Sequence, residues 1–251
     1  MIKMNKKQII ESVNPLFLQG ICHRGYHNEK DTENGLKAFQ NAIDVHMPIE
    51  LDVHLTTDNR LIVIHDSELK RVTGKEGIVE DMSVDELQSN YRLLDGEKIP
   101  TLQEVFDLVQ ERVPIVIELK VYRKNYKPLA KRLQEELKQI KDKKNFMLIS
   151  FDPRALLPFK HSGFVRQLLV AHDNKHEYVY MFRHFFEGVD LEYTFLDWKK
   201  VRRYSKKHFV NIWTVEKEEI VTKSIPYVDT ITFQNMDYQI VKDALMKKNN
   251  L

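Results

Sequence analysis

Polar and apolar residues alternate one by one over residues 49–55, and this period of two predicts a β-strand. Glu50, Asp52 and His54 share one face of that strand, and the apolar residues form the other. Residues 113–121 show the same alternation, which predicts a second strand of the same kind. In a parallel sheet covered by helices, both faces of such strands lie inside the protein. The polar side chains of the two stretches are therefore expected to point into enclosed space.

Three carboxylates and one ammonium group occupy these inward positions: Glu50, Asp52, Glu118 and Lys120. Removing a carboxylate from water without a partner costs several kcal/mol even after the protein relaxes. A bound cation is the simplest way to offset that cost. The two stretches together therefore predict a metal site.

A hairpin is predicted next to the first of these strands. Only a few residues connect 49–55 to the apolar run 61–66. Parallel strands need a crossover of about a dozen residues or more, so these two segments must run antiparallel. The returning arm then brings His65 back alongside Glu50 and Asp52.

The rest of the chain alternates between strand-like and helix-like segments. Besides the hairpin arm, strands are expected at 17–22, 49–55, 113–121, 146–151, 167–171, 188–193, 209–214 and 228–233. Helices are expected at 35–47, 102–113, 126–141, 175–186, 195–206, 216–224 and 237–248, with a short one opening at Asp152-Pro153. Eight βα units in roughly 250 residues predict one α/β domain, a (β/α)₈ TIM barrel over 1–251. Glycines and weak periodicity mark 67–99, where we expect a small inserted subdomain after the second barrel strand.

Composition narrows the class of protein. The chain has 251 residues, 42% hydrophobic and 30% charged, which suits a folded domain with a large core. A net charge of +2 is too balanced to predict a nucleic-acid partner, and Cys22, the single cysteine, allows no internal disulfide. Neither a secretory signal nor a run of about 18 apolar residues is present, so we expect a cytoplasmic protein without stable membrane insertion. No oligomeric state is predicted.

Several chemically useful residues come directly after predicted strands. His23 and Arg24 follow the first strand, Glu118 and Lys120 end the third, and Trp213 ends the seventh. In (β/α)₈ barrels the active site lies at the C-terminal ends of the strands. These residues are therefore expected to converge from separate parts of the sequence.

At these positions the chain resembles the glycerophosphodiester phosphodiesterase family. The likeness covers most of the chain, closely up to about residue 121 and more loosely afterwards. The matching pieces are His23-Arg24-Gly25, Glu33-Asn34, Glu50-x-Asp52-Val53, Thr57-x-Asn59, His65-Asp66, Arg71-x-Thr73-Gly74, Ile99-Pro100-Thr101-Leu102, Glu118-x-Lys120, Ser150-Phe151-Asp152 and Trp213-Thr214-Val215. The family fold is a (β/α)₈ barrel with a small insertion after the second strand, in agreement with the pattern described above.

The resemblance implies roles for individual residues. It assigns the metal to Glu50, Asp52 and Glu118, and acid/base catalysis to His23 and His65. Carboxylate ligands suit Mg²⁺ or Ca²⁺, and a phosphodiester oxygen can complete the coordination sphere. Which histidine acts as the acid does not follow from the sequence.

The resemblance also implies a substrate and a pathway. It assigns phosphate contact to Arg24 and Lys120, and it places Trp213 at the substrate mouth. A small-molecule glycerophosphodiester would be attacked by its own glycerol hydroxyl, giving a cyclic phosphate that water opens to glycerol 3-phosphate. Intramolecular attack gains from proximity, and no Ser or Cys nucleophile is required.

Two alternatives remain open at this stage. The substrate could be a lysophospholipid, because aromatic residues cluster between Tyr178 and Phe186 and could wall a lipid-binding mouth. The barrel could instead bind phosphodiesters without catalysis, because some loop residues depart from the family pattern. The basic run 199–207 is interpreted as a solvated helix face.

The chain departs from the family pattern at a few positions. Thr32 stands where the family usually has Pro, and Gly35 stands where it has Thr or Ser. The last strand reads Thr232-Phe233-Gln234-Asn235 instead of ending in Thr-Asp. None of these positions is expected to touch the metal or acid/base residues.

Overall fold

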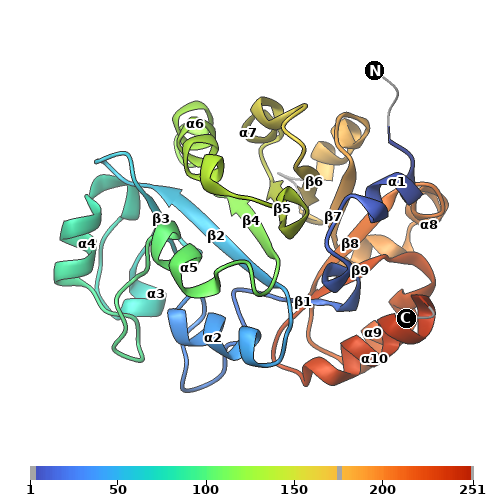
Figure 1. Cartoon of the computed structure of the whole chain (residues 1–251), viewed down its shortest axis with the longest axis horizontal. Helices are drawn as coiled ribbons and strands as arrows, with labels where there is room; N and C mark the ends of the chain where they lie inside the picture. The colour runs from blue at the N-terminus through green and yellow to red at the C-terminus, as the bar shows by residue number, and fades with distance from the viewer. Residues whose placement is uncertain (1–3, 174–176, 250–251) are drawn as a thin grey trace.

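The computed structural model describes residues 4–173 and 177–249, and within them eight parallel strands close into a barrel (Figure 1). β1 pairs with both β2 and β9, which completes the ring. The barrel strands are β1 (Ile21–Cys22), β2 (Ile49–Leu55), β4 (Ile115–Leu119), β5 (Phe146–Ser150), β6 (Val165–Val170), β7 (Gly188–Glu192), β8 (Phe209–Val215) and β9 (Thr230–Phe233). The TIM barrel predicted from the sequence is confirmed.

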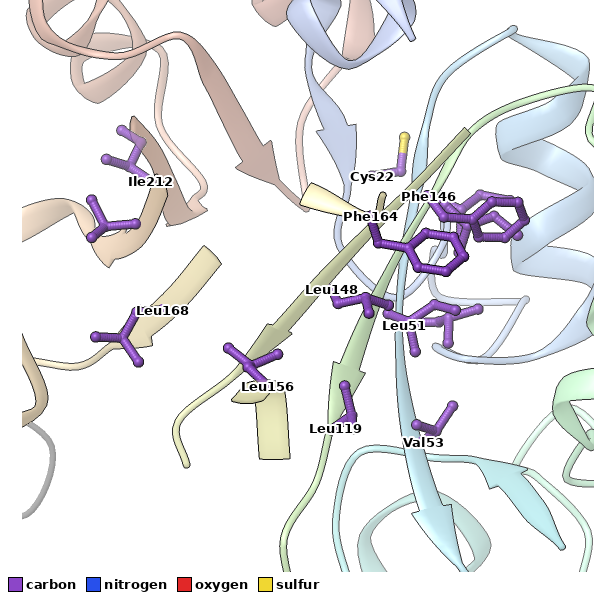
Figure 2. Packing of buried hydrophobic residues seen from close by; sticks show 14 of the residues in the cluster. Cys22, Leu51, Val53, Leu119, Phe146, Leu148, Leu156, Phe164, Leu168 and Ile212 are labelled. Carbon is purple, nitrogen blue, oxygen red and sulfur yellow. The ribbon is translucent and has the colours of Figure 1, made fainter. Parts of the chain in front are cut away.

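Helices surround the barrel and bury their apolar faces against it. They are α2 (Leu36–Asp44), α5 (Leu102–Val109), α6 (Tyr126–Glu136), α7 (Pro153–Leu156), α8 (Lys199–Ser205), α9 (Glu218–Ser224) and α10 (Tyr238–Asn249). Short 3₁₀ segments join them: η3 (Leu137–Gln139), η4 (Lys143–Asn145), η5 (Leu157–Phe159), η7 (Tyr193–Asp197) and η8 (Ile225–Tyr227). The main core cluster spans strands and helices, and Figure 2 shows members of it on β2, β4, β5, β6 and β8. Cys22 is buried within it as a free thiol.

A second core fills the barrel interior and is sealed by the N-terminal segment. The helix α1 (Lys6–Glu11), which the sequence pattern did not predict, contributes Ile9, and η1 (Pro15–Gln19) contributes Phe17. These side chains pack against interior residues such as Met147. The expected strand at 17–22 was therefore wrong in its first half, because Asn14 caps a 3₁₀ turn there and the strand begins at Ile21.

The predicted hairpin and the elements after it are present. β3 (Leu61–Val63) pairs antiparallel with the end of β2. Residues 67–99 then form α3 (Lys70–Thr73), η2 (Val79–Asp81) and α4 (Val84–Asn90), beside β3 (Figure 1). Their apolar side chains form a separate buried cluster with residues of the hairpin arm. An insertion therefore follows the second barrel strand, as expected.

The second half of the barrel deviates most from the expected helices. The helix expected at 175–186 is the 3₁₀ segment η6 (Glu177–Phe185), and its first two expected residues lie outside the described part of the chain. The helix expected at 195–206 is split into η7 and α8. Across residues 4–173 and 177–249, the structure shows no helix with both the length and the apolarity needed to cross a membrane.

Candidate active site

Three carboxylates from neighbouring strands meet inside the barrel and form the acidic cluster: Glu50, Asp52 and Glu118. Asp52 of β2 lies opposite Glu118 of β4 in the parallel register. One ligand oxygen from each residue lies within 4.8 Å of the other two, and all three side chains are buried. The pairing of β2 with β4 ends at Val53, so the cluster lies near the C-terminal end of this strand pair, as the sequence predicted.

Two side-chain cations reach the acidic cluster. The Lys120 ammonium lies 3.0 Å from Glu118 Oε1 and 3.4 Å from Asp52 Oδ1. The Arg24 Nε lies 3.5 Å from Asp52 Oδ2, and the Arg24 backbone N–H donates to Glu50 Oε2 at 3.1 Å. The predicted phosphate-binding residues therefore lie beside the predicted metal ligands.

Burial and mutual repulsion make it unfavourable for all three carboxyl groups of the acidic cluster to be ionised together. Desolvation, followed by the charges of Asp52 and Glu118, raises the pKa of Glu50 well above its ordinary value. Burial also raises the pKa of Glu118 to about 7, although Lys120 opposes the rise. Burial acts in the same direction on Asp52, but the nearby cations, with Lys120 first, hold its pKa below the ordinary value.

These features fit a divalent cation. Asp52 Oδ1 is buried and accepts no hydrogen bond from the described residues, although Lys120 lies 3.4 Å away. The donor set consists of carboxylate oxygens, which Mg²⁺ and Ca²⁺ prefer. If all three carboxylates are ionised, Lys120 and Arg24 do not neutralise them fully. A divalent cation held by Glu50, Asp52 and Glu118 would neutralise the remaining negative charge.

His23 follows β1 and lies next to the acidic cluster. Its Nε2 is 4.0 Å from Glu50 Oε2, and its Nδ1 is 2.5 Å from Oε1 of Gln234. Burial, with a smaller effect from Arg24, lowers the pKa of His23 to about 3, so the imidazole is neutral at physiological pH. The turn after it requires Gly25, because φ is +82° and a Cβ would lie 2.9 Å from the backbone of α2.

The contact between His23 and Gln234 corrects a sequence expectation. The departures from the family pattern were expected to lie away from the acid/base residues, yet Gln234 is the hydrogen-bond partner of His23. The Gln234 Nε2 in turn donates to Glu216 at 2.5 Å. His23 and Gln234 are 211 positions apart in the sequence, and the β1–β9 pairing that closes the barrel brings them together.

His65 follows β3 and is oriented by its neighbour Asp66. Its Nδ1 lies 2.7 Å from Asp66 Oδ1. Because a carboxylate only accepts, Nδ1 carries the proton and Nε2 keeps a lone pair. Arg71 Nε donates to the other oxygen of Asp66 at 2.5 Å, which fixes the carboxylate. Burial lowers the pKa of His65, and the Asp52 charge opposes this.

An alternating chain of charges joins Arg24 to His65. Arg71 donates to Glu33 through both terminal nitrogens, at 2.7 and 2.8 Å, and Glu33 also accepts from Arg24 at 2.7 Å. Burial acts to raise the pKa of Glu33, but Arg71 and Arg24 hold it at about 2. The sequence identified Glu33, Asp66 and Arg71 only as pieces of family motifs and gave them no role.

A further buried histidine supports the backbone of His65. His54 Nε2 lies 3.0 Å from the His65 carbonyl oxygen, and His54 Nδ1 lies 2.6 Å from Glu80 Oε1 in η2. Ser67 donates to the same Glu80 oxygen at 3.1 Å. His54 therefore links the insertion to the loop that carries His65.

A groove of about 1490 Å³ opens beside the acidic cluster. Glu118, Lys120 and His65 line its polar part. Its apolar part lies along η5 and η6 and is lined by Leu157, Tyr178, Val179, Phe182, Phe185 and Phe186. Charged and apolar walls therefore belong to one continuous groove.

Trp213 lies behind the wall of this groove. Its indole N–H donates to the Asp190 carbonyl at 3.3 Å, and its ring packs edge-on against Phe151, with 5.7 Å between the ring centroids. Phe151 lines the groove and Trp213 does not. The substrate contact expected of Trp213 stays a prediction, and the structure connects it to the groove through Phe151.

Comparison with known proteins places this site in a family. The model of the Glycerophosphoryl diester phosphodiesterase family matches residues 23–237, which include every candidate site residue. A putative glycerophosphodiester phosphodiesterase of Bacillus subtilis is 29% identical over 242 residues, which cover 89% of this chain and 97% of that protein.

Two further relatives align over part of their length. A glycerophosphodiester phosphodiesterase of Caldanaerobacter subterraneus is 34% identical over 152 residues, 56% of this chain and 60% of that protein. The lysophospholipase D GDPD1 of Mus musculus is 37% identical over 134 residues, 48% of this chain and 41% of that protein. The chain therefore spans less than two thirds of either relative.

Solved structures show the same barrel. A glycerophosphodiester phosphodiesterase from Parabacteroides distasonis has a TM-score of 0.72 at 26% identity, with 92% of this chain and 96% of that chain covered. An Oleispira antarctica phosphodiesterase, solved with the product sn-glycerol-3-phosphate, has a TM-score of 0.77 at 21% identity, with 91% and 96% covered. Because the family model matches most of its length, this chain belongs to the glycerophosphoryl diester phosphodiesterase family.

Proposed function

We propose that this chain is an enzyme that hydrolyses glycerophosphodiesters to glycerol 3-phosphate and an alcohol with one divalent cation, Mg²⁺ or Ca²⁺. The observation that carries the proposal is the buried acidic cluster, in which one carboxylate oxygen from each of three residues lies within 4.8 Å of the other two. It lies beside two histidines whose ring nitrogens are held by specific partners. Family membership and the named activities of the relatives support the same reaction.

Glu50, Asp52 and Glu118 would hold the cation. When bound, the cation would polarise a phosphoryl oxygen and neutralise charge that develops in the transition state. Lys120 and Arg24 are already fixed beside the acidic cluster. Their donors would bind the non-bridging phosphate oxygens without further reorganisation.

His23 and His65 would move the protons. One imidazole takes the proton of the neighbouring glycerol hydroxyl while that oxygen attacks phosphorus. The other gives a proton to the alcohol oxygen while its bond to phosphorus breaks. The result is a cyclic phosphate, which water opens to glycerol 3-phosphate with the two proton transfers reversed. Gln234 and Asp66 hold the Nδ1 atoms, so each histidine would act through Nε2.

The test is the release of glycerol 3-phosphate from glycerophosphocholine by the purified protein. We expect activity with Mg²⁺ or Ca²⁺, loss after chelation, and recovery when the cation is returned. Phosphorus NMR should show a cyclic phosphate during turnover. Turnover that continues after exhaustive chelation would contradict the proposed mechanism, and no turnover with either cation would favour the non-catalytic alternative.

A lysophospholipid is a second candidate substrate, favoured by the apolar part of the groove. An acyl chain could lie along Val179, Phe182 and Phe186 while the phosphodiester reaches the acidic cluster. Relatives named lysophospholipase D align with part of this chain. Comparing kcat/KM for lysophosphatidylcholine and glycerophosphocholine separates the two candidates, and no preference for the acylated diester would eliminate the second.

A further inference from the structure

The large apolar side chains that the described structure exposes gather beside the groove. We call this set the apolar strip: Leu157, Tyr178, Met181, Phe182 and Phe185. Met181 is 72% exposed and Phe185 is 65% exposed. Elsewhere in the described residues, the comparable side chains are Met4 and Leu94. Single exposed apolar residues need no explanation, whereas a set concentrated in one place indicates a contact surface.

The residues on the opposite face of η6 pack into the core, and this packing orients the apolar strip toward solvent. Val179 and Tyr180 are buried, and Phe186 directly after η6 is buried as well. The Tyr180 ring stacks on Phe195 with 6.3 Å between the ring centroids. Exposure of the strip is therefore not a sign that η6 is loosely attached. The same segment anchors one face in the core and presents the other to solvent.

Binding of a small molecule in the groove would not cover the strip. Met181 is its most exposed member and does not line the groove. Phe182 and Phe185 do line it, and their rings lie 6.5 Å apart. A ligand in the groove would therefore leave Met181 in water, so the strip fits a larger surface than the substrate.

Cations lie close to η6, the segment that carries most of the apolar strip. Lys200 of α8 lies 4.0 Å from the centre of the Trp198 ring and 5.7 Å from that of Tyr180, the buried residue of η6. Arg203 follows three residues later on the same side of α8. Both side chains are exposed. Exposed Arg154 of α7 also lines the groove, where it is ion-paired with Asp152 at 2.6 Å. Aromatic and aliphatic side chains bordered by Lys and Arg are typical of surfaces that bind the interface of an anionic bilayer.

We propose that the apolar strip and the cations of α8 dock this protein on the surface of an anionic phospholipid bilayer. The strip would enter the headgroup region while Lys200 and Arg203 meet lipid phosphates. A second copy of the chain fits less well, because pairing of two strips would also bring two sets of these cations together. The docked face contains the groove that leads to the acidic cluster. The proposal does not depend on which phosphodiester is hydrolysed.

The test is co-sedimentation of the purified protein with vesicles of phosphatidylcholine mixed with phosphatidylglycerol, at low and high salt. We expect binding to the mixed vesicles that weakens with salt and is weaker on pure phosphatidylcholine. Met181→Ser with Phe185→Ser should weaken binding by about tenfold or more. Lys200→Gln with Arg203→Gln should weaken it by about fivefold for each cation removed.

Matched variants from another region control for lost apolarity and charge. Leu94→Ser removes an exposed apolar side chain, and Lys37→Gln with Lys98→Gln removes two exposed cations. Both should bind vesicles like the unaltered protein, and thermal melting should confirm that every variant is folded. Failure of the unaltered protein to bind the mixed vesicles, or equal losses in the controls, would overturn the proposal. A dimer in light scattering that the strip variant dissociates would assign the strip to a second copy instead.

Discussion

The β1–β2–β4 side and the β6–β7 side of the barrel, whose strands are labelled in Figure 1, carry opposite kinds of side chains. On the first side, charged groups are buried and hold one another, as in the chain from Arg24 through Glu33 and Arg71. On the second side, η6 exposes aromatic and aliphatic side chains such as Phe185 to solvent. On the β1–β2–β4 side, hydrogen bonds and ion pairs therefore fix the positions of the charged side chains. On the β6–β7 side, the exposed apolar side chains form a surface that makes no directional contacts.

This difference separates the requirements of chemistry from those of contact. Proton transfer and phosphate binding need groups that do not reorganise during the reaction, and a buried charge network provides them. Binding to a surface of variable composition needs area more than geometry. Changes on the β1–β2–β4 side should therefore affect turnover strongly, whereas the largest effect of changes on η6 should be on binding to bilayers.

The largest effect is expected from removing one charge of the acidic cluster. Glu50→Gln keeps the size of the side chain and removes a proposed ligand, so activity on glycerophosphocholine should fall by about a thousandfold or more. Steady-state release of glycerol 3-phosphate measures this. Asp190→Asn is the control, because Asp190 is a buried acidic residue of the same barrel outside the cluster. Equal losses in both variants would contradict a special role for the acidic cluster.

Removal of either histidine should rank next. His23→Ala and His65→Ala each delete one proton transfer, and each should lower kcat by about 10²–10⁴. A substrate whose leaving alcohol has a low pKa needs less protonation by the general acid. Such substrates should therefore restore kcat in only one of the two variants, and that variant identifies which histidine is the general acid. His54→Ala serves for comparison, because His54 hydrogen-bonds the backbone carbonyl of His65 and not its ring. Unchanged kcat in either catalytic variant would rule out its assigned role.

A smaller loss is expected when the partner of His65 is weakened. Asp66→Asn keeps a hydrogen bond but no longer requires the proton to be on Nδ1, so kcat should fall by about 10–100-fold with little change in KM. The pH profile of kcat should shift as well, because the carboxylate no longer stabilises protonated His65. Asp66→Glu should restore part of the loss. A variant with altered KM alone would indicate that Asp66 acts on substrate binding instead.

The smallest effect on catalysis is expected at Asp190, where stability should change instead. Burial raises its pKa to about 8, and Oδ1 lacks a partner among the described residues. An unfolded chain releases this proton near the ordinary value of 3.8, so the free energy of unfolding should decrease as pH rises from about 4 to about 8. Asp190→Asn removes this dependence and should raise Tm more at pH 8 than at pH 4. An equal change at both pH values would contradict the assignment.

The sequence predicted what depends on local period and strand order. Alternation around Glu50 and Glu118, together with eight βα units, led to the barrel and to the acidic cluster. The expected strand at 17–22 was partly wrong, because Phe17 and its neighbours look strand-like but turn into the bottom of the barrel. Apolarity indicates burial there, and it does not distinguish a strand from a 3₁₀ turn.

The partners of the catalytic residues were not predictable in the same way. Gln234 meets His23 only because the barrel closes, and Arg71 meets Glu33 only because the insertion folds back over the first loop. Neither contact follows from a sequence period. The sequence also did not show which residues of the aromatic run 178–186 are buried: Tyr180 is buried, and Phe185 is exposed. Such a division depends on which neighbours pack against η6.

The most direct test of the central claim is a crystal structure of this protein soaked in Mn²⁺, with anomalous diffraction measured at the manganese edge. We predict a single strong anomalous peak within coordination distance of carboxylate oxygens from Glu50, Asp52 and Glu118, and its loss in Glu50→Gln crystals. A peak elsewhere, or no peak between these three side chains in crystals that diffract well, would contradict the account.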